Sequence, residues 1–336
     1  MSVLNVASSN SMVFQWHITD NCNLRCRHCY QQEYNYKGLA FHELGQIFVQ
    51  LKTFVKTRGI TQAHINLTGG EPFLRNDTID LIKKIRESNM FSLGILSNGM
   101  IPSKSVLNQL EIYRPNFVQI SLEGKRETND SIRGMGSYET IIESLKVYRK
   151  LGIPTTISFT ANSENFMDYP HVVKIARRYS VFNIWTDRYL PNGKSDTLQM
   201  TTKQFKTLCD LINKEKRKDK YPIFSETKIL AQRALQFLLC GGRPYSCSAG
   251  DSLLAILSNG DLVPCRRLPI KIGNLLSNNI NELYENSDIL EDIRNKNNLD
   301  SNCFDCYYKT SCNGGLKCLA YATTGDYNSK DSNCWL

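Results

Sequence analysis

The sequence predicts an α/β fold, namely a partial (β/α)6 TIM-like barrel followed by a cysteine-rich C-terminal domain. Two observations lead to this prediction: strand and helix patterns alternate over residues 12–189, and eight of the twelve cysteines lie in residues 240–334. Alternation of this kind implies a parallel sheet with right-handed crossovers. A series of six strands suits an open, partial barrel better than a closed barrel of eight.

The expected strands are short, apolar segments at residues 12–19, 64–67, 92–96, 117–122, 155–160 and 182–189. Five helices are expected between them, at residues 41–57, 76–88, 103–112, 138–151 and 166–179. The first helix is amphipathic, because its large apolar residues recur at helical spacing. Two further helices should link the barrel to the C-terminal part, at residues 200–218 and 225–239. A hairpin is expected at residues 258–264, just before Cys265.

The composition is that of an ordinary folded protein. With 336 residues, 41% of them hydrophobic and 22% charged, the chain can bury a substantial core in one or two domains. It has no run of about 18 apolar residues, so no transmembrane helix and no membrane partner are expected. Residues 1–11 lack the basic and apolar regions of a signal peptide, which favours a cytoplasmic location. In that reducing compartment, twelve cysteines indicate metal binding rather than disulfides.

The net charge of +9 comes from 41 basic and 32 acidic residues that are spread along the chain. One denser basic run, at residues 214–220, is interpreted as a solvated helix face. Attraction to an acidic peptide or another anionic partner is the weaker alternative. The chain has no nucleic-acid-binding motif, so nucleic acid is not an expected partner.

Three cysteines follow the first expected strand: Cys22, Cys26 and Cys29, with three and then two residues between them. Thiolates are soft ligands that select iron–sulfur clusters, zinc or copper(I). Three thiolates are one short of a closed tetrahedral zinc site, whereas a cluster held by three cysteines leaves one iron free for another ligand. The loop also lies at the carboxyl end of a strand, where α/β barrels carry their chemistry. Three unrelated buried cysteines are the alternative.

The second and third strands are also followed by distinctive residues. After the second come Gly69, Gly70 and Glu71. The glycines would let the backbone approach a ligand closely, and the carboxylate is a candidate acceptor for an ammonium group. The third strand is followed by Ser97 and Asn98. Taken alone, each of these segments would be a plain turn.

The fourth and sixth strands continue the pattern. The fourth ends at Ser121, and Arg133 follows twelve residues later. An arginine fork at that point could hold a carboxylate bidentately, although Arg133 taken alone would more often form a surface ion pair. Leu190 follows the sixth strand.

Together with the cysteine loop, these features resemble those of radical S-adenosylmethionine (SAM) enzymes over residues 12–195. The resemblance implies a partial barrel, and a 4Fe–4S cluster on the three cysteines of the loop whose free iron binds the amino and carboxylate groups of SAM. It further implies SAM contacts from His28, Gly69, Gly70, Glu71, Ser97, Asn98, Ser121, Arg133 and Leu190. The glycines and Glu71 would meet the amino group, and Ser121 and Arg133 the carboxylate and ribose. His28 and Leu190 would lie by the adenine, where His28 is a departure from the commoner aromatic residue.

The last third of the chain holds the second cysteine constellation. Cys303, Cys306 and Cys312 are separated by two and then five residues. This segment has too few apolar residues to fold on its core alone, so metal ligation would contribute the missing stability. Two zinc sites of four cysteines each are the alternative, because zinc sites with a two-residue spacing are common.

This part resembles the SPASM domain, the auxiliary-cluster extension of radical SAM peptide maturases. The resemblance implies two further 4Fe–4S clusters, one on Cys240, Cys247, Cys265 and Cys318 and one on Cys303, Cys306, Cys312 and Cys334. Five residues between Cys312 and Cys318, rather than the commoner three, are a departure. The chain would then comprise an N-terminal tail (1–11), a radical SAM barrel (12–199), bridging helices (200–239) and a SPASM domain (240–336), with SAM and three 4Fe–4S clusters as cofactors.

The resemblance implies an oxidoreductase that cleaves SAM to methionine and a 5′-deoxyadenosyl radical, which abstracts hydrogen from an unactivated carbon. The favoured substrate is a ribosomally synthesised peptide that gains a thioether or carbon–carbon crosslink or another oxidative modification. A small molecule such as a tetrapyrrole or a cofactor precursor is the alternative. An anaerobic sulfatase maturase is disfavoured, because those enzymes carry an acidic base where this chain has Arg266 and Arg267. A zinc-binding protein without catalysis is the alternative from another class.

The implied partners are a precursor peptide and an electron donor of flavodoxin or ferredoxin type. About a dozen residues precede the first strand, too few for a separate leader-binding domain. A leader peptide would therefore dock on the barrel, on the SPASM part or on a separate leader-binding protein. No general base is assigned: Glu123, Asp187 and Asp251 are candidates, and each is as readily a structural hydrogen-bond acceptor.

Overall fold

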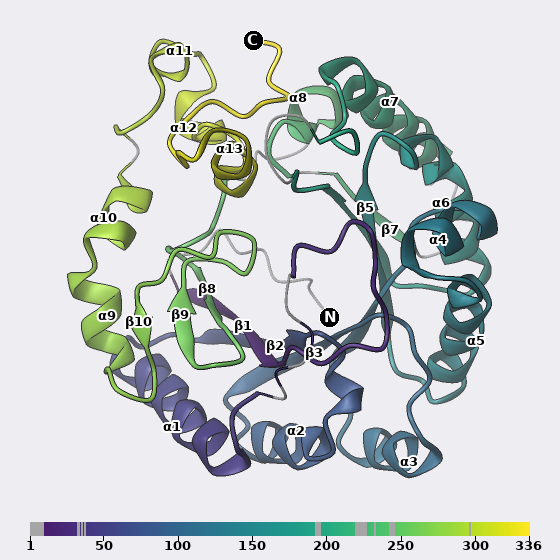
Figure 1. Ribbon diagram of the computed structural model, residues 1–336, viewed down its shortest axis with the longest axis vertical. Coiled ribbons are helices and arrows are strands. Elements are labelled where there is room, and N and C mark those ends of the chain that lie inside the picture. Colours follow the sequence, from purple (N-terminus) through teal and green to yellow (C-terminus); the bar gives the residue numbers. More distant parts are fainter. Residues whose placement is uncertain are drawn as a thin grey trace.

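One sheet runs through the fold, with its strands in the order β10-β9-β8-β1-β2-β3-β4-β5-β6-β7. The computed structural model of the chain describes residues 10–31, 34, 36, 38–191, 196–218, 227–231, 233–241, 246–295 and 297–336. Figure 1 shows that successive elements follow one another around a ring, with helices on the outside. The predicted α/β class is confirmed.

The six predicted strands are present, and each is parallel to the next. They are β1 (Ser11–Thr19), β2 (Gln62–Gly69), β3 (Phe91–Ser97), β4 (Phe117–Ser121), β5 (Thr155–Ala161) and β6 (Asn183–Arg188). The five predicted helices are also confirmed: α1 (Phe41–Thr57), α2 (Thr78–Glu87), α3 (Lys104–Ile112), α5 (Ser137–Lys150) and α6 (Tyr169–Arg178). The sequence did not predict α4 (Arg126–Arg133) or the two short 3-10 turns at Pro72–Leu74 and Phe166–Asp168.

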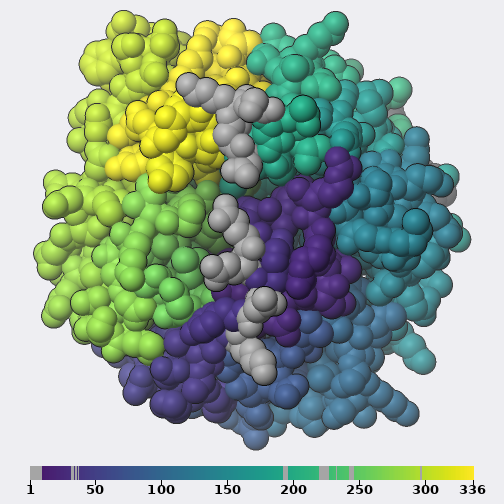
Figure 2. Space-filling view, in the orientation of Figure 1, coloured from purple at the N-terminus to yellow at the C-terminus, as the bar shows by residue number. Residues whose placement is uncertain are grey.

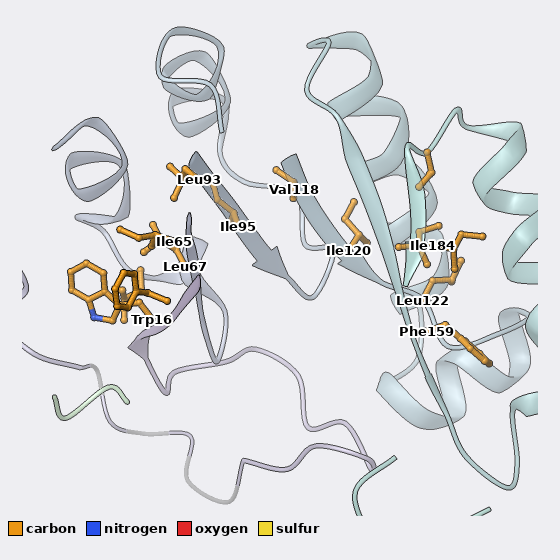
Figure 3. Close-up of a cluster of buried hydrophobic side chains, with 14 of the residues drawn as sticks. Trp16, Ile65, Leu67, Leu93, Ile95, Val118, Ile120, Leu122, Phe159 and Ile184 are labelled. Atoms are coloured by element: carbon orange, nitrogen blue, oxygen red, sulfur yellow. The ribbon is translucent and has the colours of Figure 1, made fainter. Parts of the chain in front are cut away.

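One face of these strands is apolar and packs on the helices. Phe14 of β1 lies edge-on to Phe54 of α1, with ring centroids 5.9 Å apart. Figure 3 shows the continuation of this apolar face along the sheet, with Trp16, Ile65, Leu67, Leu93, Ile95, Val118, Ile120 and Leu122, all of them fully buried. Helix α1 buries one side, because Leu44, Ile47, Phe48, Leu51, Phe54 and Val55 recur at helical spacing. Burial of this face stabilises the barrel.

The opposite face of β1 and β2 is polar. Gln15 is paired with Asn66 across the two strands, and His17 is paired with Thr68. Since side chains alternate along a strand, Gln15 and His17 lie on the face opposite to Phe14, toward the interior of the barrel. The interior is therefore lined by hydrogen-bonding groups at its first two strands.

The sheet extends beyond the six predicted strands at both edges. Strand β7 (Lys228–Leu230) is parallel to β6, and β8 (Leu253–Ile256) is parallel to β1. Strands β9 (Asp261–Val263) and β10 (Gly273–Asn274) follow as antiparallel neighbours, so the expected hairpin before Cys265 is confirmed. The prediction of a helix over residues 225–239 is wrong at Lys228–Leu230, because these residues form strand β7. Within the described part of that range, α8 (Gln236–Cys240) accounts for the helix.

The remaining helices complete the ring between the last barrel strands and α1 (Figure 1). They are α7 (Thr202–Lys218), α9 (Ile280–Asn286), α10 (Asp288–Arg294), α11 (Ser301–Phe304), α12 (Lys309–Cys312) and α13 (Lys317–Thr324). Gln50 of α1 joins this region by donating to the Leu275 carbonyl at 2.5 Å and accepting from the Ile280 N–H at 2.9 Å. Arg188 of β6 joins it on the other side, through a buried ion pair with Asp331 at 2.6 Å. None of the helices in the described residues is long and apolar enough to cross a membrane.

Candidate cofactor and cluster sites

The three cysteines of the loop after β1 lie at the carboxyl edge of the sheet. Their thiols are free and partly exposed. The loop turns back on itself, because the Cys29 N–H donates to the Cys26 carbonyl at 3.0 Å. The Cys22 sulfur accepts from the Leu24 N–H at 3.5 Å and from the Asn98 side-chain amide at 3.6 Å. Both contacts place an N–H donor at the Cys22 sulfur.

The loop after β2 lies directly against the cysteine loop. The Gly70 N–H donates to the Thr19 carbonyl and the Glu71 N–H to the Asn21 carbonyl, both at 2.8 Å. A β-carbon on Gly70 would lie 2.2 Å from the Asn21 oxygen, and one on Gly69 would lie 2.1 Å from the Thr19 oxygen. The two glycines therefore allow one loop to approach the other, and they place Glu71 beside the cysteines.

Glu71 is fully buried, and its hydrogen-bond donors among the described residues are all neutral. Its carboxylate accepts from the Phe73 N–H at 3.2 Å, the Ser97 hydroxyl at 3.0 Å and the Asn98 N–H at 2.7 Å. Burial raises the pKa of Glu71 to about 7, although these hydrogen bonds and the charge of Arg133 lower it. Such a carboxylate is suited to a cationic ligand, because a positive charge beside it would favour its ionised form.

Arg133 and Glu123 form a buried ion pair between α4 and the end of β4. Arg133 Nη1 donates to Glu123 Oε1 at 3.1 Å, and Nη2 donates to the Asn98 carbonyl at 3.4 Å. The other Glu123 oxygen accepts from the Thr160 N–H at 2.9 Å, and His28 Nε2 lies 3.4 Å from Oε1. Arg133 Nε is buried and has no hydrogen-bond partner among the described residues, so one donor is free for a ligand.

The charge of Arg133 acts on the cysteine loop. Burial raises the pKa of the Cys26 thiol, and the Arg133 guanidinium counteracts this rise. Burial also lowers the pKa of His28, so that His28 is neutral at neutral pH. Arg133 therefore supplies a positive charge beside Cys26 that counteracts the effect of burial on this thiol.

Two further sequence candidates, Ser121 and Leu190, lie at or just after the ends of β4 and β6. Ser121 is the last residue of β4 and is half-buried. Leu190 packs against the apolar cluster that contains Cys265 and Cys318. Leu190 is therefore associated with the C-terminal region.

The three candidate bases lie in different settings. Both oxygens of Glu123 are taken up by the contacts described above. Asp187 lies 3.2 Å from Arg233 and also contacts Arg267. Burial alone would raise the pKa of Asp187, but the two guanidinium groups outweigh it and hold the pKa well below its usual range. Asp251 lies on an exposed turn. The structure assigns no general base.

Four cysteines of the C-terminal region line a single pocket: Cys303, Cys306, Cys312 and Cys334. Burial is the main cause that raises the pKa of Cys312 to about 12, and neighbouring Asp331, Cys334 and Cys303 add to it. A positively charged cluster core in this pocket would relieve that accumulation of negative groups.

A second group contains Cys247, Cys265 and Cys318. Burial raises the pKa of Cys318 to about 12, Arg267 counteracts the rise, and the Cys247 and Cys265 thiols add to it. Cys240 lies elsewhere, because its thiol donates to the Cys209 carbonyl at 3.5 Å. The structure thus brings together three of the four cysteines that the resemblance ascribes to this cluster.

The cysteine groups do not have the arrangement of single-ion sites. Among the described residues, no three His, Cys, Asp or Glu side chains converge closely enough to hold one metal ion. Cysteines of a multi-iron cluster bind separate iron atoms, so they need not converge on one point.

Two protein families match the sequence. The radical SAM superfamily matches residues 16–176, and the SPASM iron–sulfur cluster-binding domain matches residues 247–307. The chain is a radical SAM enzyme with a SPASM domain. Iron–sulfur clusters and SAM binding follow from these two families.

The similarity to known proteins extends over nearly the whole chain. An AdoMet-dependent heme synthase of Methanosarcina barkeri is 23% identical to this chain, and the similarity covers 98% of each of the two chains. The PqqA peptide cyclase of Bradyrhizobium diazoefficiens is 23% identical over 95% of this chain and 84% of its own. The crystal structure of Streptococcus suis SuiB bound to precursor peptide SuiA shares the fold, with a TM-score of 0.78 at 16% identity, over 98% of this chain and 76% of SuiB.

The interior of the radical SAM barrel holds polar residues that the sequence did not identify as site residues. His17 and Tyr30 have ring centroids 6.4 Å apart, and the Arg266 guanidinium lies 5.8 Å from the Tyr30 ring. Gln15 lies on the same face of β1 as His17. The recurrence of polar residues at every second position of an otherwise apolar strand is the signal that could have identified Gln15 and His17.

Proposed function

We propose that this chain is a maturase that forms a thioether or carbon–carbon crosslink, or another oxidative modification, in a ribosomally synthesised peptide. The observation that carries the proposal is the meeting of the cysteine loop, Glu71 and the Arg133–Glu123 pair at one edge of the barrel. The likeness to a PqqA peptide cyclase supports the peptide. When bound, a 4Fe–4S cluster would supply the electron that cleaves SAM to a 5′-deoxyadenosyl radical, which abstracts hydrogen from the substrate.

The chain's own residues would bind and orient this cofactor. Cys22, Cys26 and Cys29 would hold the SAM-binding cluster, and the charge of Arg133 would favour the thiolate form of Cys26. Glu71 would accept a hydrogen bond from the SAM amino group, which gives its buried carboxylate the cation that it lacks. The free Nε of Arg133 would donate to the SAM carboxylate or ribose. The further proposed contacts are His28, Gly69, Gly70, Ser97, Asn98, Ser121 and Leu190.

The C-terminal cysteines would hold two auxiliary 4Fe–4S clusters, which makes three clusters in all. The shared pocket supports one cluster on Cys303, Cys306, Cys312 and Cys334. The second would be held by Cys247, Cys265 and Cys318, with Cys240 as its fourth ligand. Cys240 would have to exchange its contact with Cys209 for the cluster. Fully ligated clusters cannot bind substrate, so they would relay electrons.

Metal analysis tests this assignment. We expect about twelve iron atoms in the anaerobically prepared enzyme and about eight in the Cys22→Ala/Cys26→Ala/Cys29→Ala variant. Only the variant should lose formation of 5′-deoxyadenosine. Cys209→Ala is the matched control, because Cys209 is a buried cysteine outside all three proposed clusters. This variant should retain about twelve iron atoms. Zinc in place of the auxiliary iron, or 5′-deoxyadenosine from the triple variant, would refute the corresponding part of the assignment.

A tetrapyrrole is the second candidate substrate, because the likeness to the heme synthase covers 98% of both chains. Incubation with a precursor peptide should remove two hydrogen atoms per crosslink, which mass spectrometry detects. Incubation with iron coproporphyrin III should change the porphyrin mass if the second candidate is right. A change in the porphyrin alone would replace the peptide assignment.

The proposed partners and organisation follow from the same assignment. An electron donor of flavodoxin or ferredoxin type would reduce the clusters, and the leader of the precursor would dock on the barrel, on the SPASM part or on a separate leader-binding protein. The barrel would comprise residues 12–199, the bridging segment residues 200–239 and the SPASM domain residues 240–336. A cytoplasmic location is part of this proposal, since free thiols persist in a reducing compartment.

A further inference from the structure

Arg266 extends from the C-terminal region into the interior of the barrel. It follows Cys265 directly, in the loop after β9. Its backbone N–H donates to the Gln15 side-chain oxygen at 3.4 Å, and its guanidinium Nη1 donates to the Thr68 hydroxyl at 3.3 Å. Its guanidinium lies 5.8 Å from the ring centroid of Tyr30, in the cysteine loop. Arg266 therefore lies over the carboxyl ends of β1 and β2, the edge that carries the proposed SAM site.

Arg266 has no carboxylate partner among the described residues. The groups that it contacts, Gln15 and Thr68, are neutral. The two neighbouring arginines of this interior are each neutralised: Arg267 contacts Asp187, and Arg188 contacts Asp331. A partly buried guanidinium without an anion is unfavourable unless a ligand supplies one.

One side of the Arg266 guanidinium is available for a ligand. Thr68 engages Nη1, whereas Nε is buried and unpartnered among the described residues. His17, which lies next to Thr68 on the same face, also has a buried nitrogen without a partner, Nε2. Burial, aided by the charge of Arg266, lowers the pKa of His17 to about 3, so His17 adds no positive charge. The site therefore has one cation and one neutral hydrogen-bonding ring.

We propose that Arg266 is a specificity-determining residue that binds a carboxylate of the substrate through its free Nε edge. The proposal rests on the proposed function, because it places this carboxylate beside the site of hydrogen abstraction. A guanidinium fork matches a carboxylate in geometry and charge. The carboxylate can come from an Asp or Glu side chain of a peptide or from a propionate of a tetrapyrrole. The enzyme would therefore act on substrates that carry an acid next to the carbon that reacts.

Matched pairs of probes test this inference on the reconstituted, SAM-bound enzyme. One pair is iron coproporphyrin III and its tetramethyl ester. The other is a pool of heptapeptides with one Glu at random positions and the same pool with Gln. Binding is measured anaerobically by equilibrium dialysis. We expect the wild type to prefer the acid in one pair by about tenfold or more, which also identifies the source of the carboxylate.

Variants at Arg266 connect the preference to this residue. Arg266→Gln should lower affinity for the acid by about 10- to 100-fold and leave the ester or Gln probe unchanged. Arg266→Lys, which retains the charge, should recover part of the affinity. Arg126→Gln is the matched control, because it removes an exposed arginine on the outer surface. Cluster content, SAM affinity and SAM cleavage without substrate should stay at wild-type levels in all three variants.

Three outcomes would overturn the inference. The wild type could fail to prefer the acid in both pairs. Arg266→Gln could keep the preference. Arg266→Gln could weaken SAM binding instead, which would place Arg266 in the cofactor site. Absence of clusters or of SAM cleavage in the wild type would instead refute the proposed function, so the two failures are distinguishable.

Discussion

At the scale of single residues, Glu71 is where the chemistry of the proposed cofactor site depends most on environment. Its neighbours donate three neutral hydrogen bonds, yet burial still raises its pKa to about 7. The unfolded chain would ionise this carboxyl near its ordinary value, so in the free protein Glu71 disfavours folding increasingly as the pH rises toward 7. A bound ammonium group would reverse that effect, because it stabilises the ionised form.

SAM binding should consequently depend on pH through Glu71. Below about pH 7 the carboxyl is protonated in the free enzyme, so binding must release a proton and the affinity should fall by up to about tenfold per pH unit. Glu71→Gln should bind SAM more weakly at neutral pH and with little pH dependence. Equilibrium dialysis of SAM at several pH values measures both. An equal slope in the wild type and the variant would show that another group titrates.

Breaking the Arg133–Glu123 pair should lower stability strongly, because both side chains are buried. Arg133→Met would leave the Glu123 carboxylate buried without its cation, which should lower the free energy of unfolding by about 3–5 kcal/mol. Adding Glu123→Leu removes the orphaned charge but leaves the Thr160 N–H unpaired, so it should recover only part of the loss. Anaerobic denaturant unfolding measures both variants. A double variant that is less stable than Arg133→Met would contradict this reasoning.

At the scale of elements, the sequence predicted what local pattern controls. Strands β1 to β6 each bury apolar residues on the helix-facing side, so their alternation with amphipathic helices was visible. Strand β7 has three residues, Lys228–Leu230, and no strand pattern of its own. It is extended because the open edge of β6 provides hydrogen-bond partners, starting with the Phe182 carbonyl, which accepts from the Lys228 N–H at 2.9 Å. Tertiary pairing of this kind overrides local propensity.

The candidate site was predictable in its residue types but not in its pairings. Cysteine spacing and the strand-end motifs identified Glu71 and Arg133. The ion pair of Arg133 with Glu123 depends on helix α4, whose sequence is almost entirely polar and so has no apolar stripe to predict it. The contact of Cys240 with Cys209 joins α8 to α7 and is set by how those helices pack. Such contacts lie between elements, where sequence periodicity carries no information.

The two strand-end loops should tolerate no side chain at Gly70. An alanine β-carbon there would overlap the Asn21 oxygen and push the loops apart, which should lower stability by about 1–3 kcal/mol and weaken SAM binding. Gly45→Ala is the matched control, because this helical glycine has only the Lys84 amine within 4 Å. It should raise stability by about 0.5–1 kcal/mol. Anaerobic unfolding and SAM dialysis compare the two, and normal SAM binding by Gly70→Ala would disprove the close-packing argument.

At the scale of the whole molecule, the C-terminal region is fastened to the barrel on two sides. Helix α1 contacts it through Gln50, and Tyr284 of α9 packs edge-on to Phe54 at 5.1 Å. On the other side, the Arg188 guanidinium is buried against Asp331. The ring seen in Figure 1 is thus closed by contacts of two kinds, one mainly neutral and one ionic.

Loss of the ionic contact should loosen the C-terminal end first. Asp331→Ala would leave Arg188 buried without an anion, at a loss of about 3–5 kcal/mol. Limited anaerobic proteolysis should then cut within residues 297–336 before it cuts the barrel. Glu285→Ala, which removes an exposed partner of Arg58, is the control and should change stability by less than about 1 kcal/mol. Equal protease resistance of both variants would show that the ionic contact is dispensable.

The pairing of β8 with β1 has a consequence for biosynthesis. Val13 is paired with Leu253, although more than two thirds of the chain lies between them. During synthesis on the ribosome, β1 therefore waits for one of its two neighbours until β8 has been translated. Contacts of such long sequence separation slow folding, and an unpaired strand edge in the nascent chain is prone to aggregation. Productive expression should thus depend on chaperone capacity.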